Sequence, residues 1–419
     1  MRLRALLAAA APALVAATSL APAATAATTA SVEGVPRAAH VVVLVLENES
    51  FSTTWSPSSP AKYLNSLPAS GAFVPDYYGT GHVSLDNYVA MTSGLAGPQI
   101  ASTYTDCLGV NLYACVQEVS AAATLSGGSI ADQVEAAGLT WKQYADGTTK
   151  PCVHADYSPT APGQDPFQGN GNAANSAGAG PDYADRHVPF LYYANVIEDG
   201  ARCDAHLRPF TELAGDLAAD TLPSYSFITP DTCHDGHDTP CSGGGPGGLT
   251  SADAFLVAHL PALIGYLRAH DGVLFVTFDE GTPSDPSGCC TGGPGGASGF
   301  GGQVGMVVLG APVAAHATTT AKYDHASLLR TTEDMLGITA HLGNAASASP
   351  ITGIWTQPEV SSAGTPATPA PSPSAGPAGP AAISLPNTAA PPAAVPALLA
   401  LGALGGVAAA VRRRHRRGA

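Results

Sequence analysis

The order of apolar and polar positions along the chain predicts buried strands that alternate with helices. Residues 41–46 are all apolar and mostly β-branched, which is typical of a strand buried on both faces of a sheet. Further strands are expected at 139–144, 223–229, 272–278 and 305–309. Helical periodicity predicts helices after Ser84 and at 130–137, 205–219 and 252–270. This alternation predicts an α/β fold: a three-layer domain with a central, mostly parallel sheet.

The two ends of the chain differ in composition from the part between them. Residues 1–26 have a basic start, an apolar stretch and an Ala-Thr-Ala end, which is the pattern of a secretory signal peptide. An uncleaved membrane anchor is the alternative interpretation. Residues 27–360 contain the predicted strands and helices and are expected to form one domain. Residues 361–384 are rich in Pro, Ala and Ser and carry no charge, as expected of an extended linker.

Residues 385–419 have the layout of a surface-attachment signal. Leu-Pro-Asn-Thr-Ala at 385–389 precedes an apolar stretch at 395–411 and an arginine cluster at 412–417. This order resembles a sortase cell-wall sorting signal, except that Ala389 stands where the signal has glycine. Sortase and peptidoglycan are the partners that the resemblance implies. The apolar stretch is just long enough to span a membrane, with the arginines inside, so we expect an extracellular protein attached to the cell wall or membrane.

The chain is acidic, with 32 acidic and 17 basic residues. Seven of the basic residues are arginines in the predicted signal peptide and the C-terminal cluster, so the mature chain has 10 basic residues and a net charge of −22. Such a charge repels nucleic acid and anionic membrane surfaces, and no nucleic-acid partner is expected. The acidic surface would serve either solubility outside the cell or the gathering of divalent cations.

Eight cysteines in an exported chain predict disulfide bonds. Adjacent cysteines rarely bond to each other because the geometry is strained, so Cys289 and Cys290 are expected to pair elsewhere. A zinc–thiolate site is a weaker alternative, since no C-x-x-C pair recurs at zinc-ribbon spacing. Proximity along the chain favours the pairs Cys107–Cys115, Cys152–Cys203 and Cys233–Cys241.

Polar side chains that suit a divalent cation follow three of the predicted strands. Glu47 and Asn48 follow the first strand, Asp279 and Glu280 follow another, and an acid- and histidine-rich segment at 231–238 follows a third. The carboxyl ends of parallel strands meet at one edge of a sheet, so we expect these groups to converge. Neighbouring carboxylates repel one another unless a cation lies between them. Oxygen ligands would suit Ca²⁺, Mg²⁺ or Mn²⁺, and added histidines would favour Zn²⁺ or iron.

Five motifs, in their order along the chain, resemble the phosphoesterase family of bacterial phospholipases C and acid phosphatases, a branch of the alkaline phosphatase superfamily. The motifs are Glu-Asn-x-Ser-Phe at 47–51, His-x-Ser-x-x-Asn-Tyr at 82–88, His-Asp at 237–238, Thr-Phe-Asp-Glu-Gly at 277–281, and a His-x-Ser-Leu-Leu-Arg segment at 325–334. The resemblance covers about residues 39–338. It implies an alkaline phosphatase-like core and metal-dependent hydrolysis of phosphate esters.

The resemblance also implies roles for individual residues. Ser84 would be the nucleophile that attacks phosphorus, forming a phosphoserine that water hydrolyses. At the start of a helix, its hydroxyl would gain acidity from the helix dipole. Asn87 would donate a hydrogen bond to a phosphate oxygen, and Asp238 would orient a histidine or bind the metal. The metal ligands would be Glu47, Asn48, Asp279 and Glu280. The histidines that would contact phosphate, protonate the leaving oxygen or bind a second metal are His82, His237 and His325.

Three functions are compatible with these residues. The favoured one is an exported, surface-tethered phosphomonoesterase of the acid phosphatase type. The second is a phospholipase C, which would need an apolar entrance, for which the candidates are Phe167, Phe190, Tyr192 and Tyr193. The third is a surface-display protein that has lost catalysis. A structure that placed Ser84 far from the four expected metal ligands would exclude catalysis.

Overall fold

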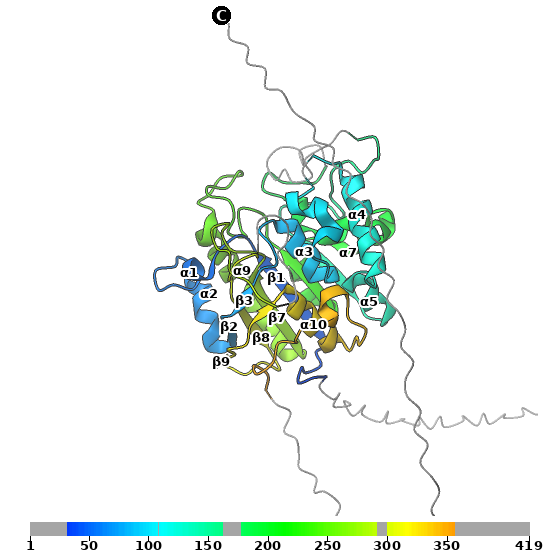
Figure 1. Cartoon of the computed structure of the whole chain (residues 1–419). Coiled ribbons are helices and arrows are strands. Elements are labelled where there is room, and N and C mark those ends of the chain that lie inside the picture. The colour runs from blue at the N-terminus through cyan, green and yellow to red at the C-terminus, as the bar shows by residue number, and fades with distance from the viewer. Residues whose placement is uncertain (1–31, 108, 162–176, 291–299, 357–419) are drawn as a thin grey trace, which may run out of the picture. The chain divides into compact units, whose positions relative to one another are not determined.

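The computed structural model describes residues 32–161 except 108, residues 177–290 and residues 300–356 (Figure 1). The chain divides into two units, 1–360 and 361–419, and every described residue lies in the first. The predicted signal peptide, linker and sorting signal lie outside the described residues and stay predictions.

An eight-stranded sheet forms the centre of the first unit, in the order β5-β4-β6-β1-β7-β8-β2-β9. Strands β5, β4, β6, β1 and β7 are parallel to one another, whereas β8 is antiparallel to both β7 and β2. The predicted mostly parallel sheet is therefore confirmed. The strands are β1 His40–Leu46, β2 Ala72–Val74, β4 Trp141–Ala145, β5 Leu207–Pro209, β6 Tyr225–Thr229, β7 Gly272–Phe278, β8 Met306–Gly310 and β9 Ala317–Thr318. A separate two-stranded sheet pairs β3 (Tyr77–Tyr78) with β10 (Tyr323–Asp324).

Strand β1 lies between β6 and β7 and positions the site. Its six apolar residues at 41–46 are buried, as predicted for a strand covered on both faces. The register pairs Leu44 with Ile228 of β6 and Leu46 with Phe278 of β7. The three strands run in the same direction, so the polar segments that follow them begin at one edge of the sheet.

Helices cover the sheet and complete a three-layer α/β domain (Figure 1). Helix α9 packs on β7 and β8, while α10 contacts β1 and packs against α3. The α-helices are α1 Phe51–Thr54, α2 Lys62–Ser66, α3 Ser84–Ser93, α4 Leu112–Leu125, α5 Ile130–Ala136, α6 Ala194–Ile197, α7 Gly200–His206, α8 Leu213–Ala219, α9 Gly248–Ala269 and α10 His325–Leu336. The 3₁₀ helices are η1 Leu67–Ser70, η2 Pro98–Thr105, η4 Asp185–His187, η5 Pro189–Tyr192, η6 Phe210–Glu212 and η8 Gly343–Ala346.

Among the described residues, only α9 is long and apolar enough to cross a membrane, and half of its most apolar window is buried inside the fold. That burial and its packing on the sheet are those of a core helix.

The single helix predicted at 205–219 is wrong. Helix α7 ends at His206, the strand β5 follows, and α8 begins only at Leu213. Pro209 lacks a backbone N–H and restricts Arg208 before it to extended conformations, so a helix cannot continue through this point. The extended segment pairs with β4 instead.

All eight cysteines form disulfide bonds. The three predicted pairs are confirmed, with Cα–Cα distances of 5.9, 5.3 and 4.7 Å in chain order. The expectation that Cys289 and Cys290 pair elsewhere is wrong, because these two neighbours bond to each other. The other six cysteines are already paired, and the backbone turns at Cys290, where φ is +75°, bringing the two sulfur atoms together.

Candidate active site

Glu47 is the centre of a buried group of polar side chains at the carboxyl end of β1. Its Oε2 accepts a hydrogen bond from Ser84 Oγ at 2.8 Å, and its Oε1 accepts one from the Tyr88 hydroxyl at 2.5 Å. Ser84 and Tyr88 lie four residues apart on α3 and therefore face the same side of the helix. Strand and helix together hold a serine hydroxyl against a carboxyl group that is fully buried.

Ser84 is the first residue of α3 and is itself buried. Val83 precedes it in an extended conformation and cannot cap the helix with an apolar side chain. One N–H of the first turn, that of Leu85, donates to Asp106 Oδ1 at 2.9 Å. The positive end of the helix dipole therefore lies at Ser84, where it favours a negatively charged group such as a phosphate.

Asn48 and Asp279 meet beside Glu47. The backbone N–H of Asn48 donates to Asp279 Oδ1 at 3.0 Å, and the N–H of Glu280 donates to the same oxygen at 2.6 Å. Asn48 has φ +54°, in the left-handed region that asparagine tolerates better than most residues. Asn48 Oδ1 and Asp279 Oδ2 are buried with no hydrogen-bond partner among the described residues, a costly state unless a positive charge lies beside them.

Glu280 and Asn87 are joined to their neighbours by hydrogen bonds. Glu280 accepts from the Asn48 amide at Oε1 (3.2 Å) and from the Asn87 amide at Oε2 (3.1 Å). Asn87 Oδ1 accepts from the N–H groups of Thr80 and Gly81 at 2.7 and 3.1 Å. Glu280 therefore orients two amides, and Asn87 braces the turn before α3. The predicted roles of metal ligand and phosphate donor stay predictions for these two residues.

Two of the predicted histidines contact backbone carbonyls. His325 is fully buried, with Nε2 2.6 Å from the Asp279 carbonyl and Nδ1 2.8 Å from the Tyr77 hydroxyl. Burial lowers the pKa of His325 to about 4, so its ring is neutral and holds the Asp279 backbone in place. His82 Nε2 lies 2.7 Å from the carbonyl of Asp285, and its Nδ1 has no partner among the described residues.

The third predicted histidine, His237, pairs with Asp238. Its Nδ1 lies 2.8 Å from Asp238 Oδ1, and Asp238 Oδ2 accepts a hydrogen bond from Thr232 at 2.7 Å. The hydrogen bond to Asp238 raises the pKa of His237. Its charge also acts on Glu47, where it opposes part of the effect of burial. His237 is the predicted histidine whose charge is felt at the centre of the site.

Two residues that the sequence did not assign, His187 and Asp235, lie beside Glu47. His187 ends η4 and stacks on the Tyr88 ring, with centroids 5.3 Å apart. Its Nε2 is 3.3 Å from Glu47 Oε1, and its Nδ1 is 3.4 Å from Asp235 Oδ2. Glu47, His187 and Asp235 form one of the groups whose geometry could hold a metal ion.

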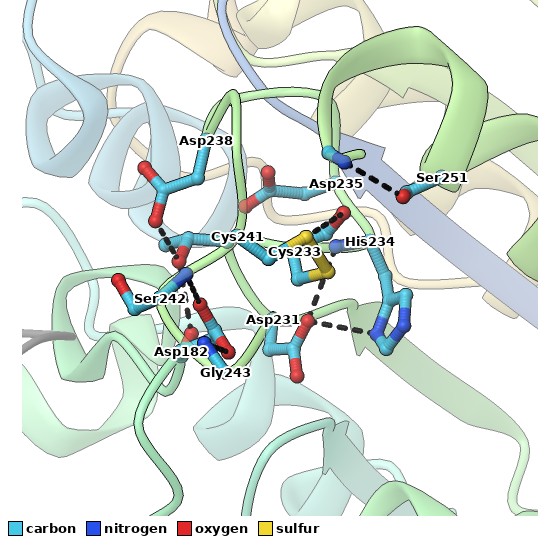
Figure 2. The surroundings of a disulfide bond; sticks show 12 residues. Asp182, Asp231, Cys233, His234, Asp235, Asp238, Cys241, Ser242, Gly243 and Ser251 are labelled. Atoms are coloured by element: carbon cyan, nitrogen blue, oxygen red, sulfur yellow. Dashed lines mark hydrogen bonds and ion pairs between the residues drawn. A yellow bond between two sulfur atoms is a disulfide. The ribbon is translucent and has the colours of Figure 1, made fainter. Parts of the chain in front are cut away.

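Nothing in the local sequence marks His187 as part of the site. It follows no predicted strand and belongs to no motif, and only the fold brings it to Glu47. Asp235 belongs to the acid-rich segment at 231–238, but nothing in the sequence distinguishes it from the other acids of that segment. Figure 2 shows the side chains of Asp235 and His234 leaving this loop in different directions.

The electrostatics of the group favour a cation. Burial, followed by repulsion between the acids, raises the pKa values of Asp235, Asp279 and Glu280, and burial also raises that of Glu47. Arg186 is the buried positive charge nearby: burial alone would lower its pKa, but the carboxyl groups around it, Asp106 first, raise it. Four buried acids, two of which (Asp235 and Asp279) have an oxygen without a hydrogen-bond partner among the described residues, and an imidazole are a suitable donor set for a divalent cation.

A groove of about 950 Å³ lies between α8 and α9. Its walls include Leu217, Phe255 and Ala258, with Asp146 and His234 among its polar residues. None of the predicted catalytic or metal-binding residues lines it. The chemistry of Glu47 and Ser84, rather than the volume of the groove, identifies the candidate active site.

The fold and the site together define a three-layer α/β enzyme with a serine–carboxylate centre at the carboxyl edge of a parallel sheet. The chain belongs to the phosphoesterase family, whose model matches residues 54–339. It is a hydrolase acting on phosphoric ester bonds. The match contains Ser84, Asp279 and His325 and begins just after Glu47 and Asn48.

Several known proteins are similar to the chain. A phosphatidylinositol-3-phosphatase of Mycobacterium tuberculosis is 27% identical over 323 residues, 76% of this chain and 84% of that protein. A probable acid phosphatase of Kluyveromyces lactis is 26% identical over 238 residues, 57% of this chain but only 46% of that protein. A solved structure of an alkaline phosphatase superfamily protein from Vibrio parahaemolyticus aligns with a TM-score of 0.41 at 14% identity, over 78% of this chain and 74% of that one.

Proposed function

We propose that the protein is a metal-dependent phosphomonoesterase of the acid phosphatase type, with Ser84 as the nucleophile. The observation that carries the proposal is the hydrogen bond between Ser84 Oγ and Glu47 within a group of buried acids. A surface-display protein would have no reason to bury a serine against a carboxyl group in this way. The contact argues against the loss of catalysis.

The residues present divide the reaction between them. Glu47, Asn48 and Asp279 would hold a divalent cation, with Glu280 orienting the Asn48 amide. When bound, such an ion supplies positive charge that stabilises a phosphoryl group and favours ionisation of a hydroxyl. Glu47 Oε2 accepts the hydrogen bond that Ser84 Oγ donates. This hydrogen bond aligns the hydroxyl oxygen for attack on phosphorus, and Glu47 would take the proton as the attack proceeds.

The remaining steps use the start of α3 and His237. The helix dipole favours the negative charge of a phosphate bound at Ser84. Asp238 holds His237 through Nδ1, which leaves Nε2 as the atom that would protonate the leaving oxygen. Water then hydrolyses the phosphoserine and releases inorganic phosphate.

Two observations favour a phosphate monoester over a phospholipid diester. The similar proteins include a phosphatidylinositol-3-phosphatase and acid phosphatases, so a phosphorylated inositol lipid is one candidate substrate. Phe190, Tyr192 and Tyr193 are buried in the core and cannot line an apolar entrance; Phe167 lies outside the described residues. Phospholipase C activity is the second candidate function.

The test compares a monoester with a diester. Purified protein is assayed on p-nitrophenyl phosphate and on p-nitrophenylphosphorylcholine, with and without EDTA, beside Ser84→Ala. Faster monoester cleavage that is lost with EDTA and in the variant supports the proposal. Preference for the choline diester would assign the protein as a phospholipase C, and no metal-dependent activity on either substrate would contradict both.

We also propose that the enzyme is exported and held at the cell surface. The support is the sequence at 1–26 and 385–419 together with four disulfide bonds, which form in oxidising compartments. Fractionation of cells tests this directly. Activity released by wall-digesting enzyme indicates covalent attachment, activity released by detergent indicates a membrane anchor, and activity in the cytoplasm contradicts export.

A further inference from the structure

His187 is enclosed between two carboxyl groups and is hydrogen-bonded to neither. Its Nε2 lies 3.3 Å from Glu47 Oε1, and its Nδ1 lies 3.4 Å from Asp235 Oδ2. The exposed fractions of Glu47, His187 and Asp235 are 0%, 2% and 1%. Both ring nitrogens and Asp235 Oδ2 lack a hydrogen-bond partner among the described residues. Buried polar atoms are almost always paired, so this group points to a ligand.

The distances argue against a charged imidazole that simply bridges the two acids. Charge-assisted hydrogen bonds from an imidazolium to carboxylates are about 2.7–2.9 Å long, shorter than both separations observed here. A neutral imidazole has one N–H and can therefore donate to only one of the two acids. The lone pair of its other nitrogen would then face the second acid at 3.3 or 3.4 Å, too far for a hydrogen bond from a protonated carboxyl group. This contact is unfavourable unless a cation lies between them.

The separation of His187 Nε2 from Glu47 Oε1 suits two ligands of one cation. Ligand atoms about 2.1 Å from a metal ion, with angles of roughly 90–110° between them, lie about 3.0–3.4 Å apart. The observed 3.3 Å falls within this range. Glu47 is also a metal ligand in the proposed function, and it accepts a hydrogen bond from the proposed nucleophile Ser84.

We propose that His187 is a nitrogen ligand of the metal ion held by Glu47, bound through Nε2, and that Asp235 orients it by accepting the Nδ1–H bond. The inference rests on the metal dependence of the proposed function. Metal-binding histidines usually donate their second ring N–H to a carboxylate or carbonyl group. Tyr88 supports both ligands, because its ring stacks on His187 and its hydroxyl donates to Glu47.

A nitrogen ligand changes which metal the site prefers. Sites built only of carboxylate and amide oxygens suit Ca²⁺ and Mg²⁺, whereas mixed nitrogen and oxygen sites suit Zn²⁺, iron and other transition metals. The enzyme is therefore expected to bind Zn²⁺ in preference to Ca²⁺. His187 would be the source of that preference.

Calorimetric titration of the full-length, chelator-treated protein with Zn²⁺ and with Ca²⁺ tests the assignment. Asp235→Asn is expected to weaken Zn²⁺ binding ten- to a hundredfold, the usual size of the effect of a residue that supports a ligand. His187→Gln removes the ligand itself and should weaken Zn²⁺ binding more. Ca²⁺ binding should change much less in His187→Gln. His234→Gln is the matched control, because His234 also lies between two carboxyl groups. The Zn²⁺ affinity of the His234→Gln variant should equal that of the wild type.

A spectroscopic measurement on the wild type keeps the proposal testable if a variant fails to fold. Electron spin-echo modulation of the Mn²⁺-loaded protein should show a directly bound nitrogen, and this signal should disappear in His187→Gln but persist in His234→Gln. Absence of the nitrogen signal in the wild type overturns the proposal. So does its persistence in folded His187→Gln.

The outcomes separate this inference from the proposed function. If EDTA abolishes activity but His187→Gln keeps wild-type Zn²⁺ affinity and selectivity, the nitrogen ligand is wrong and the metal-dependent phosphatase stands. If the wild type binds neither metal and is insensitive to EDTA, both fail.

Discussion

Two histidines of this protein each lie between two carboxyl groups, and their properties are opposite. His234 Nδ1 is 2.8 Å from Asp231 Oδ1 (Figure 2). The same nitrogen is 2.9 Å from Asp146 Oδ2, and 40% of the His234 side chain is exposed. The hydrogen bonds to the two acids raise the pKa of His234 to about 10. His187 makes no hydrogen bond to its acids, and burial lowers its pKa well below 6.5.

Access to water explains the difference. At the surface, an imidazole and two acids form ordinary ion pairs, and solvent screens the leftover charge. In the interior the same residue types cannot keep unpaired charge without a compensating ligand. A thiolate ligand beside His234 is also ruled out, because Cys233 is bonded to Cys241. Residue types alone therefore do not distinguish a metal site from a surface ion pair, but burial and hydrogen bonding do.

Replacing the nucleophile should produce the largest contrast between the two regions. Ser84→Ala is expected to lower kcat at least about a thousandfold, since removal of a catalytic nucleophile leaves only residual activity. His234→Gln, in the exposed group, should keep kcat within about threefold. Steady-state assays on p-nitrophenyl phosphate measure both, with circular dichroism to show that each variant is folded. Equal losses of kcat in the two variants would contradict the assignment of catalysis to the buried group around Ser84 and Glu47.

Removal of the metal ion should lower the stability of the fold at the buried group of Glu47, His187 and Asp235, and not at the exposed histidine His234. Treatment with EDTA is expected to lower the melting temperature, since an ion present at 100 to 1,000 times its Kd stabilises the folded state by about 3–4 kcal/mol. Differential scanning calorimetry before and after addition of Zn²⁺ measures the change. His234→Gln should show the same metal-dependent shift as the wild type. A melting temperature that EDTA leaves unchanged would argue against a structural contribution from a bound ion.

Loss of the Tyr88 hydroxyl should have a smaller effect. Tyr88→Phe removes the donor to Glu47 Oε1 and should cost about 1–3 kcal/mol of unfolding free energy by leaving a buried oxygen without its partner. The matched control is Tyr266→Phe, since Tyr266 donates to Asp220 at the exposed surface; its effect should be within about 0.5 kcal/mol. Urea unfolding measures both. A larger cost for the surface tyrosine would reverse the expected order.

The smallest effect is expected at the exposed histidine, and it should depend on pH. The folded-state pKa of His234 is raised to about 10 from 6.5, so its ion pairs stabilise the fold fully below pH 6.5 and cease to do so as the pH rises through 10. Because 40% of the His234 side chain is exposed to solvent, the expected loss in His234→Gln is at most about 1 kcal/mol at pH 6. Unfolding free energies of variant and wild type should converge above pH 10. A difference in unfolding free energy that grows with pH would contradict the stabilising ion pairs assigned to His234.

The sequence predicted the centre of the sheet better than its edges. Strands β1 and β7 are buried on both faces, so their long apolar runs were recognisable. The edge strands β5 and β9, and β2 next to β9, have only two or three residues each. Such short segments carry no periodicity of their own, and their conformation is set by the neighbours with which they pair.

The site was predictable where a residue follows a strand or belongs to a motif. Glu47, Asn48 and Asp279 follow central strands, and Ser84 begins a helix, so the contact between Ser84 and Glu47 agrees with expectation. His187 was not predictable, because it reaches Glu47 from a short 3₁₀ helix about 140 residues further along the chain. Such a contact depends on tertiary packing rather than on local sequence.

The position of β1 between β6 and β7 has a consequence for the timing of activity. Glu47 is made early in synthesis, but the strands that flank β1 are Tyr225–Thr229 and Gly272–Phe278, which emerge much later. Pairings between segments so distant in the chain form slowly, after long loops have closed. A growing polypeptide that ends before Asp279 already contains Ser84 and Glu47 but still lacks Asp279 and Glu280 of the proposed active site. With Asp279 in its proposed role, phosphoester hydrolysis is therefore expected only from the finished domain.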